Sequence, residues 1–178
     1  MSNIQIHDKQ FAPYYSKKKI AEKVSLLAAA LKSDLKNEIP LILPILNGSF
    51  IFAADFLRAF DGPCEVSFVK LSSYQDTKSS GNVQQLIGVN ENLAGRTVVL
   101  LEDIIDTGTT LQSMCDLLKE QPIKELKVAA LFFKPDVFKK ELHLDYVGFR
   151  IPDEFIVGYG LDYNGQGRNL SSIYKLEN

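Results

Sequence analysis

The sequence predicts an α/β fold: a central, mainly parallel sheet flanked by helices, with a small irregular hood lobe added to it. The first observation is that short apolar segments alternate with amphipathic ones as far as Lys134, an alternation that is typical of parallel sheets. The second is that the apolar segments are nearly continuous, as in strands that are buried on both faces. The third is that the chain after Lys134 is rich in aromatic residues and glycine, which predicts the hood.

The first helix is expected at 16–35. Ser16 is a suitable N-cap, and apolar residues then recur every three or four positions, at Ile20, Val24, Leu27, Leu31 and Leu35. The apolar run 40–46 predicts a buried strand, which ends at Asn47 and the glycine and serine that follow it. Residues 49–60 predict a helix that packs on this strand.

Residues 64–71 predict a second strand, because apolar and polar residues nearly alternate there. The next segment, 72–85, is polar and rich in Ser, Gly and Gln, and so predicts a long loop without regular structure. Such a loop inside a compact domain is usually either functional or disordered. Further strands are expected at 97–102 and 126–133 with a helix at 109–119 between them, and a short strand is expected at the C-terminal end.

Length and composition fit one globular domain. The chain has 178 residues, of which 46% are apolar and 24% charged, with a net charge of −2. We expect a single domain at 1–178, with a core at about 14–134 and a hood built from N-terminal residues and about 135–178. The near-neutral charge argues against a nucleic-acid partner, which would require a broad basic face.

The cysteines and the hydropathy of the chain predict its cellular compartment. Cys64 and Cys115 lie in apolar surroundings without metal-ligand spacing, which predicts two reduced thiols in a cytoplasmic protein. The N-terminal residues lack the apolar run of a secretion signal, and no apolar stretch approaches the ~20 residues that a membrane helix needs. We therefore expect a cytoplasmic location and no membrane partner.

The stretch 98–111, VVLLEDIIDTGTTL, contains the residue types that most strongly indicate a ligand-binding site. Ligands of open α/β sheets bind at the carboxyl ends of the strands, and the helix start that follows offers unpaired N–H groups that favour phosphate. Gly108 allows a close approach of the backbone, while Glu102 and Asp103 suit sugar hydroxyls or hydrated Mg²⁺. The residues alone also allow a plainer interpretation, in which Asp106 is an N-cap and the other two acids form a solvated turn.

This stretch closely resembles the phosphoribosyl-pyrophosphate (PRPP) signature of the type I phosphoribosyltransferases: an apolar strand, two acids, two apolar residues and a loop rich in Asp, Thr and Gly. Four other segments are similar, in the expected order, to the hypoxanthine (or hypoxanthine-guanine) branch of that family: LPILNGSFIFAADFL, SSYQDTKSSG, LFFKPD and VGFRIPDEFIVGYGLDYNGQGRNL. The resemblance covers roughly residues 10–175. It implies purine salvage, in which the 5-phosphoribosyl group of PRPP is transferred to hypoxanthine, and also to guanine, giving IMP or GMP and pyrophosphate.

The resemblance assigns roles in the PRPP signature. It implies that Glu102 and Asp103 bind the 2′- and 3′-hydroxyls of the ribose. Asp106 matches the residue near N7 of the purine, as the catalytic general base or as a stabiliser of the positive charge that develops on the ribose. The cradle for the 5′-phosphate would consist of Thr107, Gly108, Thr109 and Thr110.

Two other segments would contact the pyrophosphate. The pyrophosphate loop is matched by Leu46, Asn47, Gly48 and Ser49, and the family is expected to hold a cis peptide bond between the first two of these residues. The pattern itself shows only a turn at the end of a strand. Arg168 matches a guanidinium that reaches pyrophosphate, and its planar fork suits phosphate oxygens.

The resemblance also implies Mg²⁺ as the cofactor. Asp162 in the hood matches the metal ligand of the family and is also expected beside the purine. Glu102 and Asp103 are the other candidate ligands. Carboxylate oxygens suit this hard cation, which usually keeps several waters and binds substrate phosphates.

The purine would be recognised by residues that follow the last predicted core strand. Lys134 matches the lysine that contacts the 6-oxo group, Phe155 the ring that stacks on the base, and Ile156 the residue whose carbonyl accepts a hydrogen bond from it. Ser73 and Tyr74 match the start of the mobile loop that closes over the reaction centre. The residues alone also allow Lys134 to be a cation at the end of a strand and Phe155 to belong to the core.

Two positions depart from the pattern of the resemblance. Many relatives have lysine where this chain has Asn47, and lysine or arginine where it has Thr109. Less positive charge in these loops predicts a weaker affinity for PRPP, and leaves open a subunit contact that some relatives make through the first lysine. A homo-oligomer, dimer or tetramer, is still expected.

Two alternative functions fit the sequence less well. A PRPP-sensing regulator that binds RNA would need a basic face, which a net charge of −2 argues against. A phosphosugar-binding α/β enzyme outside this family is disfavoured by the hood segment with Phe155 and Asp162. We therefore expect a transferase whose partners are PRPP and a purine base, with xanthine disfavoured.

Overall fold

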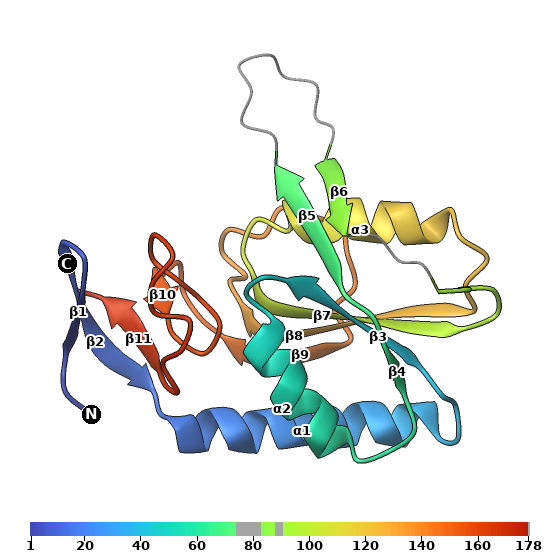
Figure 1. Cartoon of the computed structure of the whole chain (residues 1–178), viewed down its shortest axis with the longest axis horizontal. Helices are drawn as coiled ribbons and strands as arrows, with labels where there is room; N and C mark the ends of the chain where they lie inside the picture. Colours follow the sequence, from blue (N-terminus) through green and yellow to red (C-terminus); the bar gives the residue numbers. More distant parts are fainter. Residues whose placement is uncertain (74–82, 88–90, 178) are drawn as a thin grey trace.

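The computed structural model describes residues 1–73, 83–87 and 91–177, with the backbone alone at 71–73 and 83–87. The described chain forms two sheets, of which the larger lies at the centre of the molecule and the smaller at one end (Figure 1). The larger sheet has the order β6-β5-β3-β7-β8-β9, with the short β4 also paired to β3. Its strands are β3 (Leu41–Leu46), β4 (Glu65–Val66), β5 (Val69–Ser73), β6 (Val83–Ile87), β7 (Thr97–Ile105), β8 (Glu125–Phe133) and β9 (Tyr146–Arg150).

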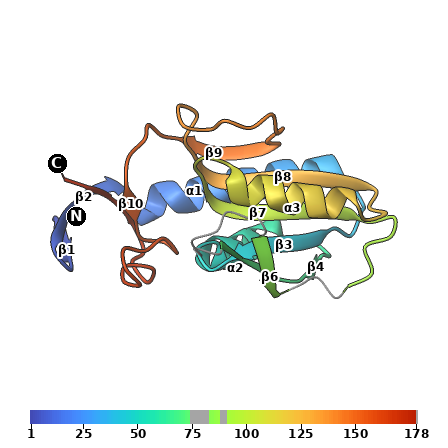
Figure 2. The same ribbon diagram turned by 90° about the horizontal axis from the view of Figure 1, so that it is seen from above.

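All pairings in the larger sheet are parallel except the one between β5 and β6. Helices α1 (Lys17–Leu35) and α2 (Phe50–Phe60) cover one face, and α3 (Thr109–Lys119) covers the other (Figure 1). Seen from above, β9 and β6 lie at opposite edges of this sheet (Figure 2). The predicted α/β class with a mainly parallel central sheet is therefore confirmed.

The core is divided by the sheet into two apolar layers. On β7, Val99 and Leu101 pack with the residues of α1 and α2, whereas Val98 and Leu100 pack with those of α3. All four side chains are fully buried. This alternation is the period of a strand covered on both faces, and it explains why the segment reads as a continuous apolar run.

The first helix begins where the sequence predicts. Ser16 is its N-cap, and the Ser16 hydroxyl accepts a hydrogen bond from the Lys19 backbone N–H at 3.3 Å. The strand expected at 97–102 is longer than predicted, because its parallel ladder with β8 continues as far as the pair Ile105–Phe133. Glu102 and Asp103 therefore lie inside the strand rather than in a turn after it.

Two predictions between α2 and β7 need correction. The single strand expected at 64–71 is two strands, since β4 pairs with the start of β3 and β5 with its end. The loop expected at 72–85 is partly strand, because β6 pairs antiparallel with β5. Residues 74–82 of that loop, which include the predicted loop residue Tyr74, lie outside the described residues, and Ser73 is the last residue of β5.

The smaller sheet is the hood, and it is built from both ends of the chain. Its order is β1-β2-β11-β10, from β1 (Ile4–Ile6), β2 (Lys9–Tyr15), β10 (Ile156–Val157) and β11 (Ile173–Leu176), all paired antiparallel. Phe11 and Val157 are fully buried in its small core. Strand β9 belongs to the larger sheet, so the region expected as hood from about 135 onward includes one strand of the core.

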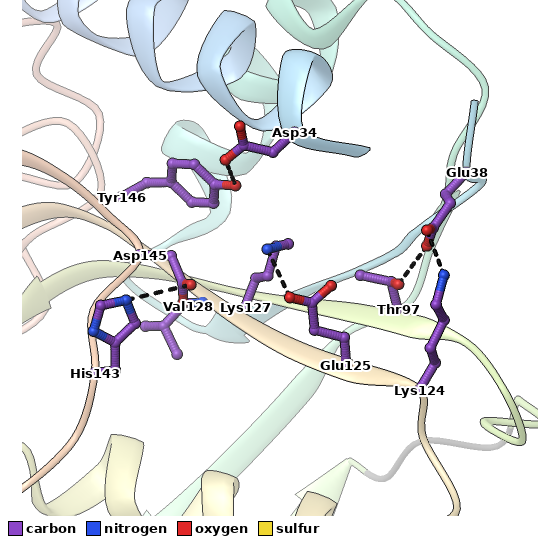
Figure 3. Close-up of polar contacts among 10 residues, drawn as sticks. All are labelled: Asp34, Glu38, Thr97, Lys124, Glu125, Lys127, Val128, His143, Asp145 and Tyr146. Carbon is purple, nitrogen blue, oxygen red and sulfur yellow. Dashed lines mark hydrogen bonds and ion pairs between the residues drawn. The ribbon is translucent and has the colours of Figure 1, made fainter. Parts of the chain in front are cut away.

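Polar contacts gather around the amino ends of the parallel strands (Figure 3). The Tyr146 hydroxyl donates to Asp34 at 2.6 Å and links β9 to α1, while the Thr97 hydroxyl donates to Glu38 at 2.6 Å. These side chains satisfy one another's hydrogen-bonding groups at this end of the sheet. Among the helices that the structure describes, none has the length and apolarity needed to cross a bilayer.

Candidate active site

Three of the segments singled out in the sequence lie at the carboxyl edge of the larger sheet. Strands β3, β7 and β8 are parallel neighbours and end at Leu46, Ile105 and Phe133. The segment after each strand therefore emerges on the same side of the molecule, where open α/β sheets bind their ligands. These segments carry the predicted pyrophosphate loop, the predicted phosphate loop and Lys134.

Glu102 and Asp103 are buried at this edge, with 7% and 8% of their surface exposed. Burial raises the pKa of both carboxyls above their ordinary values, and for Glu102 the neighbouring Asp103 carboxylate raises it further. Backbone N–H groups and the positive charge of Arg168 partly oppose the increase at Asp103. The interpretation of these two acids as a solvated turn is therefore wrong.

The loop after β3 packs closely against this acid pair. The peptide bond between Leu46 and Asn47 is cis, which confirms the expectation drawn from the resemblance. A Cβ atom placed on Gly48 would lie 1.7 Å from Oδ2 of Asp103, so no other residue fits there without displacing the carboxylate. The hood reaches the same point, because a Cβ on Gly160 would lie 2.0 Å from the Gly48 carbonyl oxygen.

The predicted phosphate loop leads into α3 with its N–H groups available. Gly108 is the N-cap residue, at φ +79°, and no side chain caps the helix start. Asp106 is therefore not the helix cap that its position also allowed. A pocket of about 90 Å³ lies here, lined by Glu102 and the stretch 104–111. An uncapped helix start with a pocket beside it is a suitable site for an anion.

Lys134 joins the core to the segment that enters the hood. Its ammonium is 3.2 Å from Oδ2 of Asp106 and 2.8 Å from Oδ1 of Asp153, and only 6% of the residue is exposed. Burial alone would lower the pKa of Lys134, but its hydrogen bonds to Asp153 and Asp106 raise it above the ordinary value, so the amine is charged. Lys134 is thus a paired, buried cation rather than a solvated one.

The hood presents an exposed ring and a backbone edge. Phe155 is 44% exposed, and its ring packs edge-on against Tyr163 at 5.9 Å between centroids. The Leu176 N–H donates to the Phe155 carbonyl, so in the antiparallel ladder the N–H and C=O of Ile156 point away from β11. Strand β10 is the last strand of that sheet, which leaves the Ile156 carbonyl on an open edge among the described strands.

Arg168 and Asp162 are paired with each other. Nη2 of Arg168 lies 2.6 Å from Oδ1 of Asp162, and Nη1 donates to the Gly160 carbonyl at 2.7 Å. The Gly165 N–H donates to the second oxygen of Asp162 at 2.7 Å. Because Gly160 touches Gly48, this pair stands close to the loop after β3.

Within the part of the chain that is described, no three or more His, Cys, Asp or Glu side chains are grouped so that they could hold a metal ion. Asp162 forms an ion pair with Arg168, and Glu102 and Asp103 of β7 are buried. Such an arrangement fits Mg²⁺ that is held mainly by phosphates, hydroxyls and water, with one or two protein carboxylates. Hard carboxylate oxygens are the donor type that this cation prefers.

Sequence reasoning missed Asp153, the second partner of Lys134. Its only local signal is an acid two positions before the exposed Phe155, in the segment IPDEF. At one edge of an α/β sheet, the structure thus brings together buried acids, an uncapped helix start and a buried lysine that is paired with two carboxylates.

Comparison with known proteins identifies the family. The chain belongs to the phosphoribosyl transferase domain family, whose model matches residues 12–164. The chain is 43% identical over 160 residues to the hypoxanthine-guanine phosphoribosyltransferase of Streptococcus agalactiae, with 89% of each chain covered. It is 38% identical over 159 residues to the protein of that name from Bacillus subtilis, with 89% of this chain and 88% of the relative covered.

Solved structures agree with this assignment. The hypoxanthine phosphoribosyltransferase of Staphylococcus aureus superposes with a TM-score of 0.87 at 35% identity, covering 93% of this chain and 90% of the other. A hypoxanthine-guanine phosphoribosyltransferase of Bacillus anthracis superposes with a TM-score of 0.86 at 38% identity, covering 93% of this chain and 96% of the other. The type I phosphoribosyltransferase fold predicted from the sequence is confirmed.

Proposed function

We propose that this protein is a purine-salvage enzyme that transfers the 5-phosphoribosyl group of PRPP to hypoxanthine, and also to guanine, releasing pyrophosphate. The observation that carries the proposal is that Lys134 and Asp106, paired at 3.2 Å, stand at the same sheet edge as the acid pair of β7 and the uncapped start of α3. This arrangement supports a single site in which Lys134 would serve the base, the acid pair the ribose and the helix N–H groups the phosphate. The relatives named above support the purine substrate.

The binding steps follow from the chemistry of each group. The first N–H groups of α3, with the threonine hydroxyls of 107–110, receive the 5′-phosphate because a helix start attracts anions. Glu102 and Asp103 accept hydrogen bonds from the ribose hydroxyls. The loop at Leu46, Asn47 and Gly48 and the guanidinium of Arg168 receive the pyrophosphate. Arg168 then exchanges all or part of its pairing with Asp162 for phosphate oxygens.

The base is held between the two lobes. Phe155 offers an exposed ring for stacking, Lys134 donates to the 6-oxo group, and the outward carbonyl of Ile156 accepts from the ring edge. Asp106 takes the proton from the base nitrogen, or stabilises the positive charge on C1′, as the bond to pyrophosphate breaks and the bond to the base forms. The Asp106 carboxylate is half exposed, so a bound base can reach it.

Mg²⁺ completes the proposal as the cofactor. Asp162 is the hood carboxylate that would reach it, with Glu102 and Asp103 on the side of the ribose. When bound, the cation would neutralise the charge of the pyrophosphate leaving group. Asn47 and Thr109 supply no positive charge at the phosphate loops, so in this chain more of that neutralisation falls to the cation and to Arg168.

A cytoplasmic location and a homo-oligomer, dimer or tetramer, are also part of the proposal. Both cysteines are free, as expected in a reducing compartment. Sedimentation analysis of the purified chain determines the oligomeric state. Nucleic acid and membranes are not among the proposed partners.

The test is steady-state turnover with PRPP, Mg²⁺ and each of hypoxanthine, guanine, xanthine and adenine. We expect nucleotide formation with hypoxanthine and guanine, and little with xanthine or adenine. Absence of turnover with all four bases would refute the purine-salvage proposal. Binding of RNA in a PRPP-dependent manner, without turnover, would instead favour a regulatory function.

A further inference from the structure

Lys134 has three ammonium hydrogens and two carboxylate partners from different parts of the chain. Asp106 approaches it from the segment between β7 and α3, and Asp153 from the segment between β9 and β10. The contact with Asp153 is the shorter, at 2.8 Å against 3.2 Å. An ammonium with two acceptors in place has one hydrogen left to donate. In the proposed function this third hydrogen goes to the 6-oxo group of the base.

We propose that Asp153 is a positioning residue for purine recognition, which shares the Lys134 ammonium with Asp106 and so directs its free hydrogen to the 6-oxo group. This inference rests on the proposed function and deepens it. Without Asp153, a buried ammonium with one remaining carboxylate partner would move fully onto Asp106, because a buried charge requires the closest available counter-charge. Lys134 would then be withdrawn from the base.

The backbone fixes Asp153 close to the end of β8. The Ile151 N–H donates to the Phe133 carbonyl at 2.9 Å, and the Lys134 N–H donates to the Ile105 carbonyl at 3.0 Å. The Glu154 N–H donates to the Pro152 carbonyl at 2.7 Å and closes a tight turn around Asp153. These bonds place the acid and the lysine side by side at the point where the chain leaves the core for the hood.

Asp153 contributes little to the fold through this contact. Its side chain is 61% exposed, so solvent screens the pair, and the buried Lys134 ammonium keeps Asp106 as a counter-charge when Asp153 is lost. Lys134, in contrast, is buried, so its direction depends on its partners. Loss of Asp153 should therefore change what Lys134 recognises more than it changes the stability of the chain. A purely structural role would show the opposite pattern.

The experiment uses two nucleotides: IMP, which has the 6-oxo group and a hydrogen on N1, and purine ribonucleoside 5′-monophosphate, which has hydrogen on C6 and none on N1. The N1 difference is the same for every protein variant, so the change in preference between variants is the quantity compared. Calorimetry gives the dissociation constant of each nucleotide for the full-length chain and for Asp153→Asn. Glu154→Gln is the matched control, because Glu154 forms an ion pair with Lys175 at 3.1 Å in the same segment. Thermal unfolding of all three proteins is measured in parallel.

We expect the original chain and Glu154→Gln to prefer IMP. In Asp153→Asn the preference should fall roughly ten- to a hundredfold, the loss of one hydrogen bond to a charged group, with the affinity for the 6-hydrogen nucleotide unchanged. An unchanged preference in Asp153→Asn, or equal weakening of both nucleotides, would overturn the role of Asp153. If the original chain binds neither nucleotide, the proposed function itself is wrong.

Discussion

Gly48→Ala tests whether the loop after β3 and the acid pair of β7 form one surface. A Cβ at this position would lie 1.7 Å from Oδ2 of Asp103, and ordinary contact begins at 3.4 Å, so the carboxylate oxygen must retreat by about 1.7 Å. Gly48 is not among the glycines with a positive φ, so alanine adds no backbone strain and the effect is purely steric. Overpacking of this kind costs about 1–3 kcal/mol of stability.

The effect on activity should exceed the effect on stability. Displacement of a substrate-positioning group by 1 Å can cost ~100-fold in rate, so kcat/KM for PRPP should fall by at least that factor. The assay is IMP formation at varied PRPP with saturating hypoxanthine. Gly62→Ala is the matched control, since its Cβ would approach no atom closer than 3.2 Å, at the Phe60 ring. A Gly48→Ala protein with kcat/KM within threefold of the original would refute this packing of Asp103.

Three further predictions concern the base, the phosphate and the thiols. Phe155→Ala should raise KM for hypoxanthine about tenfold or more with little change in melting temperature, because the ring is 44% exposed and stacking on a base is worth ~1–3 kcal/mol; an unchanged KM would show that the ring only packs in the hood. Thr109→Lys should lower KM for PRPP about fivefold, since one added charge at roughly 4 Å in a solvated site is worth ~1 kcal/mol; a raised KM would contradict this. Burial raises the pKa of both thiols, that of Cys115 to about 11, and Cys115 is buried whereas Cys64 is partly exposed, so iodoacetamide at pH 8 should label Cys64 first in peptide mapping. Faster labelling of Cys115 would contradict its burial.

The central fold could be predicted because its signals are local. Strands β3, β7 and β8 are short apolar runs, and α1 has both a serine cap and an apolar stripe. The hood could not be predicted in the same way. Strand β1 has only three residues, β2 has no regular alternation of polar and apolar residues, and β2 pairs with β11 at the other end of the chain. Nothing near Phe11 in the sequence indicates which distant residues will bury it.

In the candidate site, too, local sequence patterns could be predicted, whereas contacts that depend on the fold could not. The acids of β7 and the start of α3 lie in one continuous stretch whose pattern indicates a ligand site. Their burial could not be foreseen, because it depends on how far β8 extends the ladder beside them. The contact of Lys134 with Asp153 joins residues that are 19 positions apart, and it depends on how the segment after β9 packs at the end of β8, where the Ile151 N–H donates to the Phe133 carbonyl.

The most direct test of the account is the rate of IMP formation from PRPP, Mg²⁺ and hypoxanthine by the original chain and by Asp106→Asn, measured side by side. The account predicts turnover by the original chain and a kcat lower by roughly 10–10⁴-fold in the variant, as expected for loss of an acid–base group. Circular dichroism spectra of the two proteins should coincide. Equal kcat values in the two proteins would contradict the assignment of the reaction to the carboxyl edge of the sheet.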